Sequence, residues 1–412
     1  MNAEDVAARS AIESLRSGVP SRHAVTQLGT TQTEVKTHFD AGLQVLAEGR
    51  GVAPIVVSAT FGAGKSHLLN YLQSLAAQQG FVTSFVVVSP EMPLGNASTV
   101  LRTLAEAAQA PGNADTALRA LAARLNATST GFADLKAWTR DAGLDDRFRA
   151  LLHIYQEFRA DEELRAQILD DFEGKFLPKP VLRQKLKELG VLVSYDLNGP
   201  RNALVAHDRL RLLAQLYRAG GGKGLVILFD ELERIAKFSV KQRLSAYQEL
   251  GWWSEVAQQE DSAIFPIFTM TRGFLEESIT GGTRDEQRFL ANVDSRNGMA
   301  DERDLRALRG IGLLKKPFFL ESPTPEQEEQ VKYRVKALYE QAYNTSVPPL
   351  PRVRADVRTS IRSEIRRWIT MWDLHRYYPD YMPHVETSSV EFDTSEISDQ
   401  ALAEAESEDS NE

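Results

Sequence analysis

Cysteine is absent from the 412 residues of this sequence. Its absence excludes disulfides, thiolate metal sites and cysteine nucleophiles, and it is typical of a reducing compartment. The sequence also lacks a signal-peptide pattern and any apolar run of about 18 residues, the length needed to cross a bilayer. We therefore expect a cytoplasmic protein with no membrane partner.

Basic residues are missing from the C-terminal segment. No Lys or Arg follows Arg376, whereas eleven acidic residues lie from Asp380 onward. The net charge of −9 therefore belongs to this tail, and the rest of the chain is near neutral at +2. Because Ser, Thr, Asp and Glu dominate residues 379–412, we expect a disordered acidic tail. It either aids solubility or forms an arm that mimics nucleic acid or docks a basic partner.

Short apolar runs alternate with helical patterns in the middle of the chain. Runs typical of buried parallel strands lie at residues 54–58, 81–88, 224–229, 263–270 and 316–320. Their alternation with helices predicts an α/β fold with a parallel sheet over residues 51–320. The long helical stretch between the second and third runs predicts a helical insertion at about residues 111–199.

Helical segments flank this predicted core. Residues 1–50 form an N-terminal helical segment, with helices expected at 4–17 and 33–47. Thr324, Pro325 and Gln327 have the pattern of a capped helix start. With a second helix over 353–375, residues 321–378 predict an all-helical C-terminal lid.

The strongest motif is ATFGAGKS at residues 59–66, between a predicted strand and a predicted helix. It resembles the phosphate loop (P-loop) pattern G-x-x-x-x-G-K-S/T. The loop amides and the helix N-terminus form a cradle for the β-phosphate, while the Lys65 ammonium lies between the β- and γ-phosphates and the Ser66 hydroxyl ligates Mg²⁺. Ala59 replaces the first glycine, which costs about 1 kcal/mol or more if that backbone needs a positive φ. The predicted ATP-binding residues are Thr60, Phe61, Gly62, Ala63, Gly64, Lys65, Ser66 and His67.

A second motif is the apolar run 225–229 followed by Asp230 and Glu231. An apolar strand that ends in two acids is typical of a Walker B strand. Asp230 is then expected to hold Mg²⁺ through its water shell, and Glu231 to orient and polarise the attacking water. The alternative is an acidic pair at a helix N-terminus. Glu233 is interpreted as a helix-start acid rather than a second catalytic carboxylate.

Polar residues at the end of the fourth run and on the lid complete the predicted site. Thr271 is the first choice for a residue that touches the γ-phosphate or the lytic water, and Thr269 is the second. Arg362 is chosen as the lid sensor among arginines at helical spacing, which are Arg354, Arg358, Arg362 and Arg366. An arginine finger that acts on a neighbouring subunit is expected after the fourth run. The arginines in this stretch are Arg272, Arg284, Arg288 and Arg296. The alternative for the threonines is that they merely end a strand, and the alternative for the arginines is that they are solvated surface residues.

Four stretches together resemble the BrxD-type ATP-binding proteins of bacterial BREX phage-exclusion systems, which are similar to AAA+ P-loop ATPases. They are residues 11–20 (AIESLRSGVP), 61–67 (FGAGKSH), 228–233 (LFDELE) and 365–373 (IRRWITMWD). The resemblance implies an AAA+-like P-loop NTPase with ATP and Mg²⁺ as cofactors and a role in anti-phage defence beside other defence proteins. Carried over to this chain, it implies Lys65, Glu231, Thr271 and Arg362 as catalytic residues, with Ser66 and Asp230 at the metal.

Two classes of function follow. The first is an ATP-hydrolysing motor or switch whose lid closes over bound nucleotide. The second is an ATP-dependent scaffold with negligible turnover that assembles defence components. A kinase is a weaker third class, because the sequence shows no acceptor-pocket signature. DNA is a possible partner, which the basic patch Lys175–Lys187 and the lid arginines would contact. A homo-oligomer is possible as well.

Overall fold

The computed structural model describes residues 3–18, 21–112, 116–122, 124–125, 128–197, 203–281, 284–295, 302–350 and 360–379. Within them lies a five-stranded sheet in the order β2-β3-β4-β1-β5, and its strand pairs are parallel. The strands are β1 (Ile55–Ala59), β2 (Val82–Val87), β3 (Leu225–Asp230), β4 (Ile264–Thr271) and β5 (Phe318–Phe319). Each of the five apolar runs therefore overlaps a strand, and the last strand is only two residues long. Because β4 lies between β1 and β3, the ends of these three strands meet at one edge.

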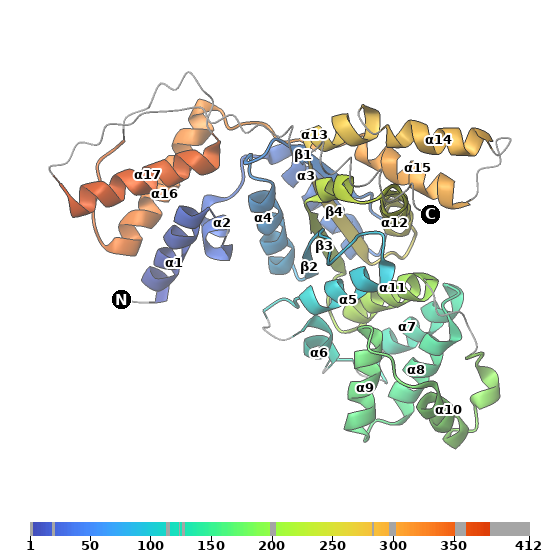
Figure 1. Cartoon of the computed structure of the whole chain (residues 1–412). Coiled ribbons are helices and arrows are strands. Elements are labelled where there is room, and N and C mark those ends of the chain that lie inside the picture. The colour runs from blue at the N-terminus through green and yellow to red at the C-terminus, as the bar shows by residue number, and fades with distance from the viewer. Residues whose placement is uncertain are drawn as a thin grey trace.

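Helices cover both faces of the sheet (Figure 1). Side chains alternate along a strand, so Val57 and Leu228 point to one face while Val56 and Phe229 point to the other. The first face packs against α3 (Thr33–Ala47) and α4 (Lys65–Gln78). The second face packs against α5 (Ala97–Ala107), α11 (Ala203–Ala219), α12 (Val240–Ala257) and α15 (Glu302–Leu314). Buried strands with apolar residues on both sides explain the continuous runs in the sequence.

The connection between β2 and β3 contains the insertion, at the bottom of Figure 1. Its helices are α6 (Ala117–Ala122), α7 (Thr130–Asp141), α8 (Asp146–Glu157), α9 (Glu162–Phe172) and α10 (Lys179–Glu188), followed by a 3-10 turn at Leu192–Ser194. Its apolar core is continuous with the second face of the sheet. The fully buried carboxylate of Asp171 accepts bonds from Arg147 and from Arg209, the latter at 3.0 Å. This pair of contacts joins α9 to α8 and α11.

The segment predicted to be a lid contains α16 (Pro325–Tyr343) and α17 (Ile361–Tyr377), and we keep the name lid for these two helices. Helix α16 begins as predicted, with the Thr324–Gln327 capping box in place. Two N-terminal helices, α1 (Ala3–Ser17) and α2 (Arg22–Leu28), share the lid's hydrophobic core, where Ile12 is buried with Trp368 and Trp372. Residues 1–50 are thus divided between two cores, because α3 packs on the sheet instead.

The second lid helix starts later than predicted. The expected helix over 353–375 is wrong at its beginning, because Ser360 has an extended backbone (φ −67°, ψ 148°) and caps α17 by accepting a bond from the Ser363 amide. Arg354 and Arg358 lie outside the described residues, as do Arg296 and the acidic residues of the tail.

The segment between β3 and β5 completes the second face. A 3-10 helix, Leu232–Lys237, leads from β3 into α12. After β4, α13 (Arg272–Phe274) and a π-helical turn (Leu275–Thr280) lead into α14 (Asp285–Ser295). Helices α14 and α15 project on the side of the sheet opposite the lid (Figure 1).

Candidate functional site

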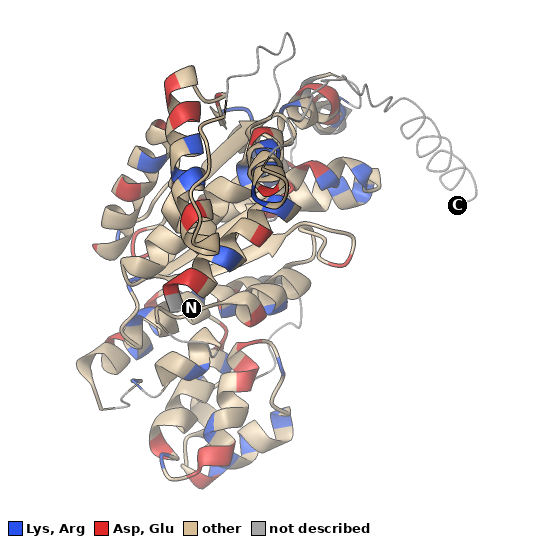
Figure 2. Cartoon of the chain, turned by 90° about the vertical axis from the view of Figure 1, so that its left-hand side faces the viewer, with Lys and Arg blue, Asp and Glu red and all other residues tan. Residues whose placement is uncertain are grey.

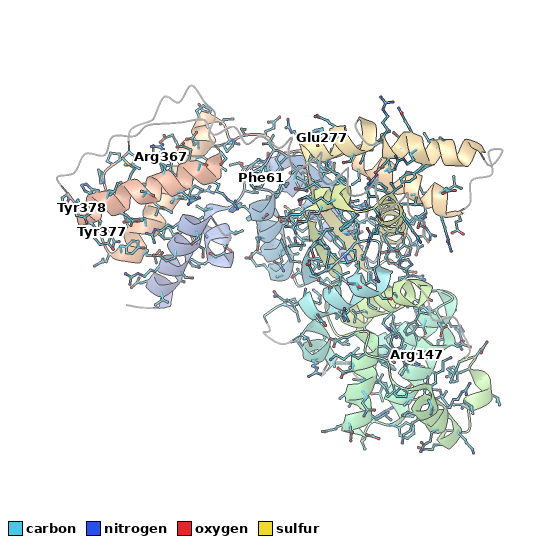
Figure 3. All side chains as sticks on the ribbon, in the orientation of Figure 1. Phe61, Arg147, Glu277, Arg367, Tyr377 and Tyr378 are labelled. Carbon is cyan, nitrogen blue, oxygen red and sulfur yellow. The ribbon has the colours of Figure 1, made fainter. Side chains whose placement is uncertain are left out.

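A cavity of about 280 Å³ lies where the sheet meets the lid. Its lining comes from the phosphate loop, the tip of β3, the segment 28–32 and the start of α17. Phe61, a residue that is 87% exposed, lies at this junction between lid and core (Figure 3). Segments that are distant in the sequence therefore enclose one space beside the carboxyl ends of the strands.

Residues 61–68, which include most of the predicted phosphate loop, line this cavity. Gly64 caps α4 in a left-handed conformation (φ 97°) and offers no side-chain cap to the first turn. The first amides of a helix have no intrahelical partner, so an uncapped N-terminus binds anions. Gly62 also has a positive φ (79°), and a Cβ there would lie 3.3 Å from the Ser360 side chain of the lid. Both glycines are needed for the turn itself.

Ala59 takes the place of the usual first glycine without strain. It is the buried last residue of β1 and is not among the positive-φ positions. We predict that Ala59→Gly leaves ATP affinity within about twofold and lowers stability by about 0.5–1 kcal/mol, because glycine weakens a strand. Calorimetric titration and urea unfolding measure the two quantities. A large gain in affinity would contradict the unstrained geometry.

The loop and the tip of β3 meet through a hydroxyl–carboxylate contact. The Ser66 hydroxyl donates to Asp230 Oδ2 at 2.7 Å, and the buried Thr269 hydroxyl donates to Asp230 Oδ1 at 2.5 Å. Asp230 is itself only 3% exposed. The two residues predicted at the metal, 164 positions apart, are thus in direct contact.

Ser66 and Asp230 fit a magnesium ion that is also held by phosphates. Mg²⁺ prefers oxygen donors and is usually bound through one or two carboxylates with water and substrate phosphate. Among the described residues, no group of three or more His, Cys, Asp or Glu side chains could hold a metal alone. A magnesium ion held by Ser66 and Asp230 would need further oxygen ligands, such as water or phosphate.

The two glutamates after Asp230 have different surroundings. Glu231 lines the cavity with a left-handed backbone (φ 64°) and pairs with Arg234. Glu233 stands in the first turn of the 3-10 helix, as a helix-start acid would. Its carboxylate also lies 3.8 Å from the Lys65 ammonium and accepts a bond from the Thr271 amide at 3.2 Å. Burial raises the pKa of the Glu233 carboxyl.

The threonines of β4 are placed differently from each other. Thr269 is fully buried and bonds Asp230, whereas Thr271 is the partly exposed last residue of the strand and contributes its amide to Glu233. Thr271 pairs in register with Ala59, next to the phosphate loop. A polar residue inside an otherwise apolar strand is the sequence signal that singles out Thr269.

The predicted arginines lie on two sides of the molecule. Arg362 is exposed, lines the cavity at the start of α17 and approaches Gly18. Arg272 lies over the Phe319 ring and donates to the Leu320 carbonyl at 3.4 Å. Arg284 and Arg288 are exposed at the beginning of α14, on the side away from the lid (Figure 1).

One set of contacts near the cavity has no signal in the sequence. His67 donates through Nε2 to the Gly29 carbonyl at 2.8 Å, and burial lowers the pKa of His67. Arg334 of α16 donates to the adjacent Leu28 carbonyl at 2.5 Å. The segment 28–32 is thereby held by both the phosphate-loop helix and the lid. These contacts join residues far apart in the chain.

Comparison with known families gives one match. The family model for the BREX system ATP-binding protein BrxC/D matches residues 4–153 and 145–389. No curated protein matches the chain. In the described part of the structure, none of the helices combines the length and apolar character that a membrane span requires.

Proposed function

We propose that this chain, which belongs to the family of BREX system ATP-binding proteins BrxC/D, is an AAA+-like P-loop ATPase. We place it in the cytoplasm, where it acts as a motor or switch in anti-phage defence. The observation that carries this proposal is the convergence of Lys65, Ser66 and Asp230 with the uncapped N-terminus of α4 in one cavity. Amides, an ammonium and a metal-binding carboxylate together match the charge of a triphosphate with Mg²⁺.

The remaining residues take roles around the γ-phosphate. Glu231 polarises the attacking water, and Thr271 at the strand tip contacts that water or the phosphate. Arg362, the second residue of α17, senses the nucleotide from the lid. Mg²⁺ held near Ser66 and Asp230 neutralises charge on the phosphates. Lid closure over the nucleotide then changes how the partners bind.

We predict that Lys65→Ala weakens Mg-ATP binding at least tenfold and removes phosphate release, because the buried ammonium is the cation that the loop aims at the phosphates. Phosphate release and nucleotide affinity are measured for wild type and variant. The surface variant Lys36→Ala, which loses only a pair with Asp40, serves as the matched control. Normal ATP affinity in Lys65→Ala would contradict the placement of the phosphates.

The alternative is an ATP-dependent scaffold with negligible turnover. It predicts that wild type binds Mg-ATP but releases no phosphate, even with partner proteins and duplex DNA present. The same assay with and without DNA therefore separates the two functions.

The proposed partners are other BREX components. DNA and a second copy of the chain are proposed as further partners. In the basic patch, Lys175 pairs with Asp170 and Lys185 with Glu188. Basic and acidic residues are interspersed on the face shown in Figure 2. DNA contact therefore relies on partners more than on this chain alone. Arg284 and Arg288 are exposed and do not line the cavity of their own chain, so a role at a nucleotide requires a neighbouring subunit.

A further inference from the structure

The ammonium of Lys65 faces a carboxylate inside the site. Its Nζ lies 3.8 Å from Glu233 Oε1, and the Lys65 residue is 8% exposed. At this burial the pair is screened by solvent far less than a surface pair. Any phosphate that binds Lys65 must therefore compete with a carboxylate that is in place beforehand.

Glu233 is held in the position from which it competes. Its Oε2 accepts the Thr271 amide from the tip of β4, while Oε1 faces Lys65. The nearby guanidinium of Arg234 is taken up by Glu231, so Lys65 is the cation that faces Glu233. Burial raises the pKa of Glu233, which agrees with a carboxylate that has few compensating charges around it.

We propose that Glu233 holds Lys65 in the nucleotide-free chain and is displaced from it by the γ-phosphate, so that Glu233 sets how strongly the site discriminates a nucleoside triphosphate from a diphosphate. This inference rests on the proposed function, because it assumes that the phosphates occupy the loop. A diphosphate ends at the β-phosphate, so the Lys65 ammonium can contact that phosphate and still pair with Glu233. A triphosphate brings further negative charge to the same ammonium and repels the carboxylate.

The consequence is a site whose affinity for the triphosphate is lowered more than its affinity for the diphosphate. Removal of the Glu233 charge relieves both the competition for Lys65 and the repulsion of the γ-phosphate. Glutamine is the suitable replacement, since its amide oxygen still accepts the Thr271 amide. Glu233 is thus a specificity-determining residue, distinct from Glu231.

The test measures the dissociation constants of a β,γ-imido ATP analogue and of ADP, each with Mg²⁺, by calorimetry. For Glu233→Gln we expect the triphosphate analogue to bind about tenfold more tightly, equivalent to about 1.4 kcal/mol, and ADP less than threefold more tightly. Glu233→Asp, which shortens the side chain, is expected to change the ratio in the same direction by a smaller factor. Glu173→Gln is the matched control, since Glu173 is another partly buried glutamate with a raised pKa but lies in the insertion. It should change neither constant.

The outcomes separate this inference from the function on which it rests. If wild type binds both nucleotides and the triphosphate-to-diphosphate ratio is unchanged in Glu233→Gln and in Glu233→Asp, the role of Glu233 is refuted and the ATP site stands. Weaker triphosphate binding in a folded Glu233→Gln also refutes it, because Glu233 would then support the nucleotide. If wild type binds neither nucleotide, both proposals fail. Circular dichroism verifies that each variant is folded, and Glu233→Asp decides the question should Glu233→Gln not fold.

Discussion

Replacement of Glu231 by glutamine is expected to lower phosphate release at least about 100-fold while Mg-ATP stays bound, because a positioned general base typically contributes about 10²–10⁴-fold. Glu231 lines the cavity directly after the Asp230 carboxylate that bonds Ser66. Glutamine has the same length and leaves the backbone at φ 64° equally strained, so the change removes the charge and basicity and, with them, the ion pair to Arg234. Single-turnover phosphate release and nucleotide retention after rapid gel filtration measure the two expected effects.

The control for this prediction is Glu173→Gln, whose phosphate release should equal that of wild type. A Glu231→Gln chain that hydrolyses ATP at the wild-type rate would show that another group activates the water. A wild-type chain that binds ATP but releases no phosphate under any condition would favour the scaffold instead.

Gly310→Ala is expected to lower the free energy of unfolding by about 3 kcal/mol or more, because overpacking against rigid backbone is among the most costly core changes. A Cβ at Gly310 of α15 would lie 2.0 Å from the Tyr247 carbonyl of α12, and one at Gly251 would lie 2.0 Å from the Arg306 carbonyl. These atoms belong to the backbone of the facing helix, so only separation of the helices can relieve the clash. Urea unfolding followed by circular dichroism gives the loss as a shift in midpoint.

Gly312→Ala is the matched control on the same helix. No heavy atom lies within 4 Å of a Cβ at Gly312, so alanine there should be neutral or stabilise by up to about 1 kcal/mol through helix propensity. Equal midpoints for the two variants would refute the close contact of α12 and α15. Helix α12 also packs Trp253 against Phe229 of β3, with ring centroids 5.3 Å apart. A shift of α12 should therefore reach the neighbouring Asp230 and weaken ATP binding as well.

The parts of the fold that sequence reasoning predicted depend on local or periodic signals. The strands are continuous apolar runs because both faces of the sheet are covered, and the start of α16 follows from the Thr324 capping box. The start of α17 was predicted too early, since the apolar spacing continues upstream while Ser360 ends it with a single hydroxyl. The packing of α1 on the lid has no local signal at all. It depends on contacts such as that of Arg16 with Asp373 at 2.7 Å, across most of the chain.

The same distinction applies to the site. The predicted phosphate loop and the acids after β3 are contiguous motifs, and in the structure the Ser66 hydroxyl donates to the Asp230 carboxylate. Contacts between separate elements could not be derived, because their partners are set by the strand order. Lys65 meets Glu233 and His67 meets Gly29 only after the chain has folded. The roles of all the predicted site residues stay predictions, namely those of Lys65, Ser66, Asp230, Glu231, Thr271 and Arg362.

The most direct test of the account is a calorimetric titration of Mg-ATP into the folded wild-type chain. We predict saturable binding of one nucleotide per chain, with the affinity reduced at least tenfold in Lys65→Ala. The absence of binding at millimolar Mg-ATP, in protein shown to be folded by circular dichroism, would contradict the claim that the loop, Lys65 and Asp230 enclose a triphosphate.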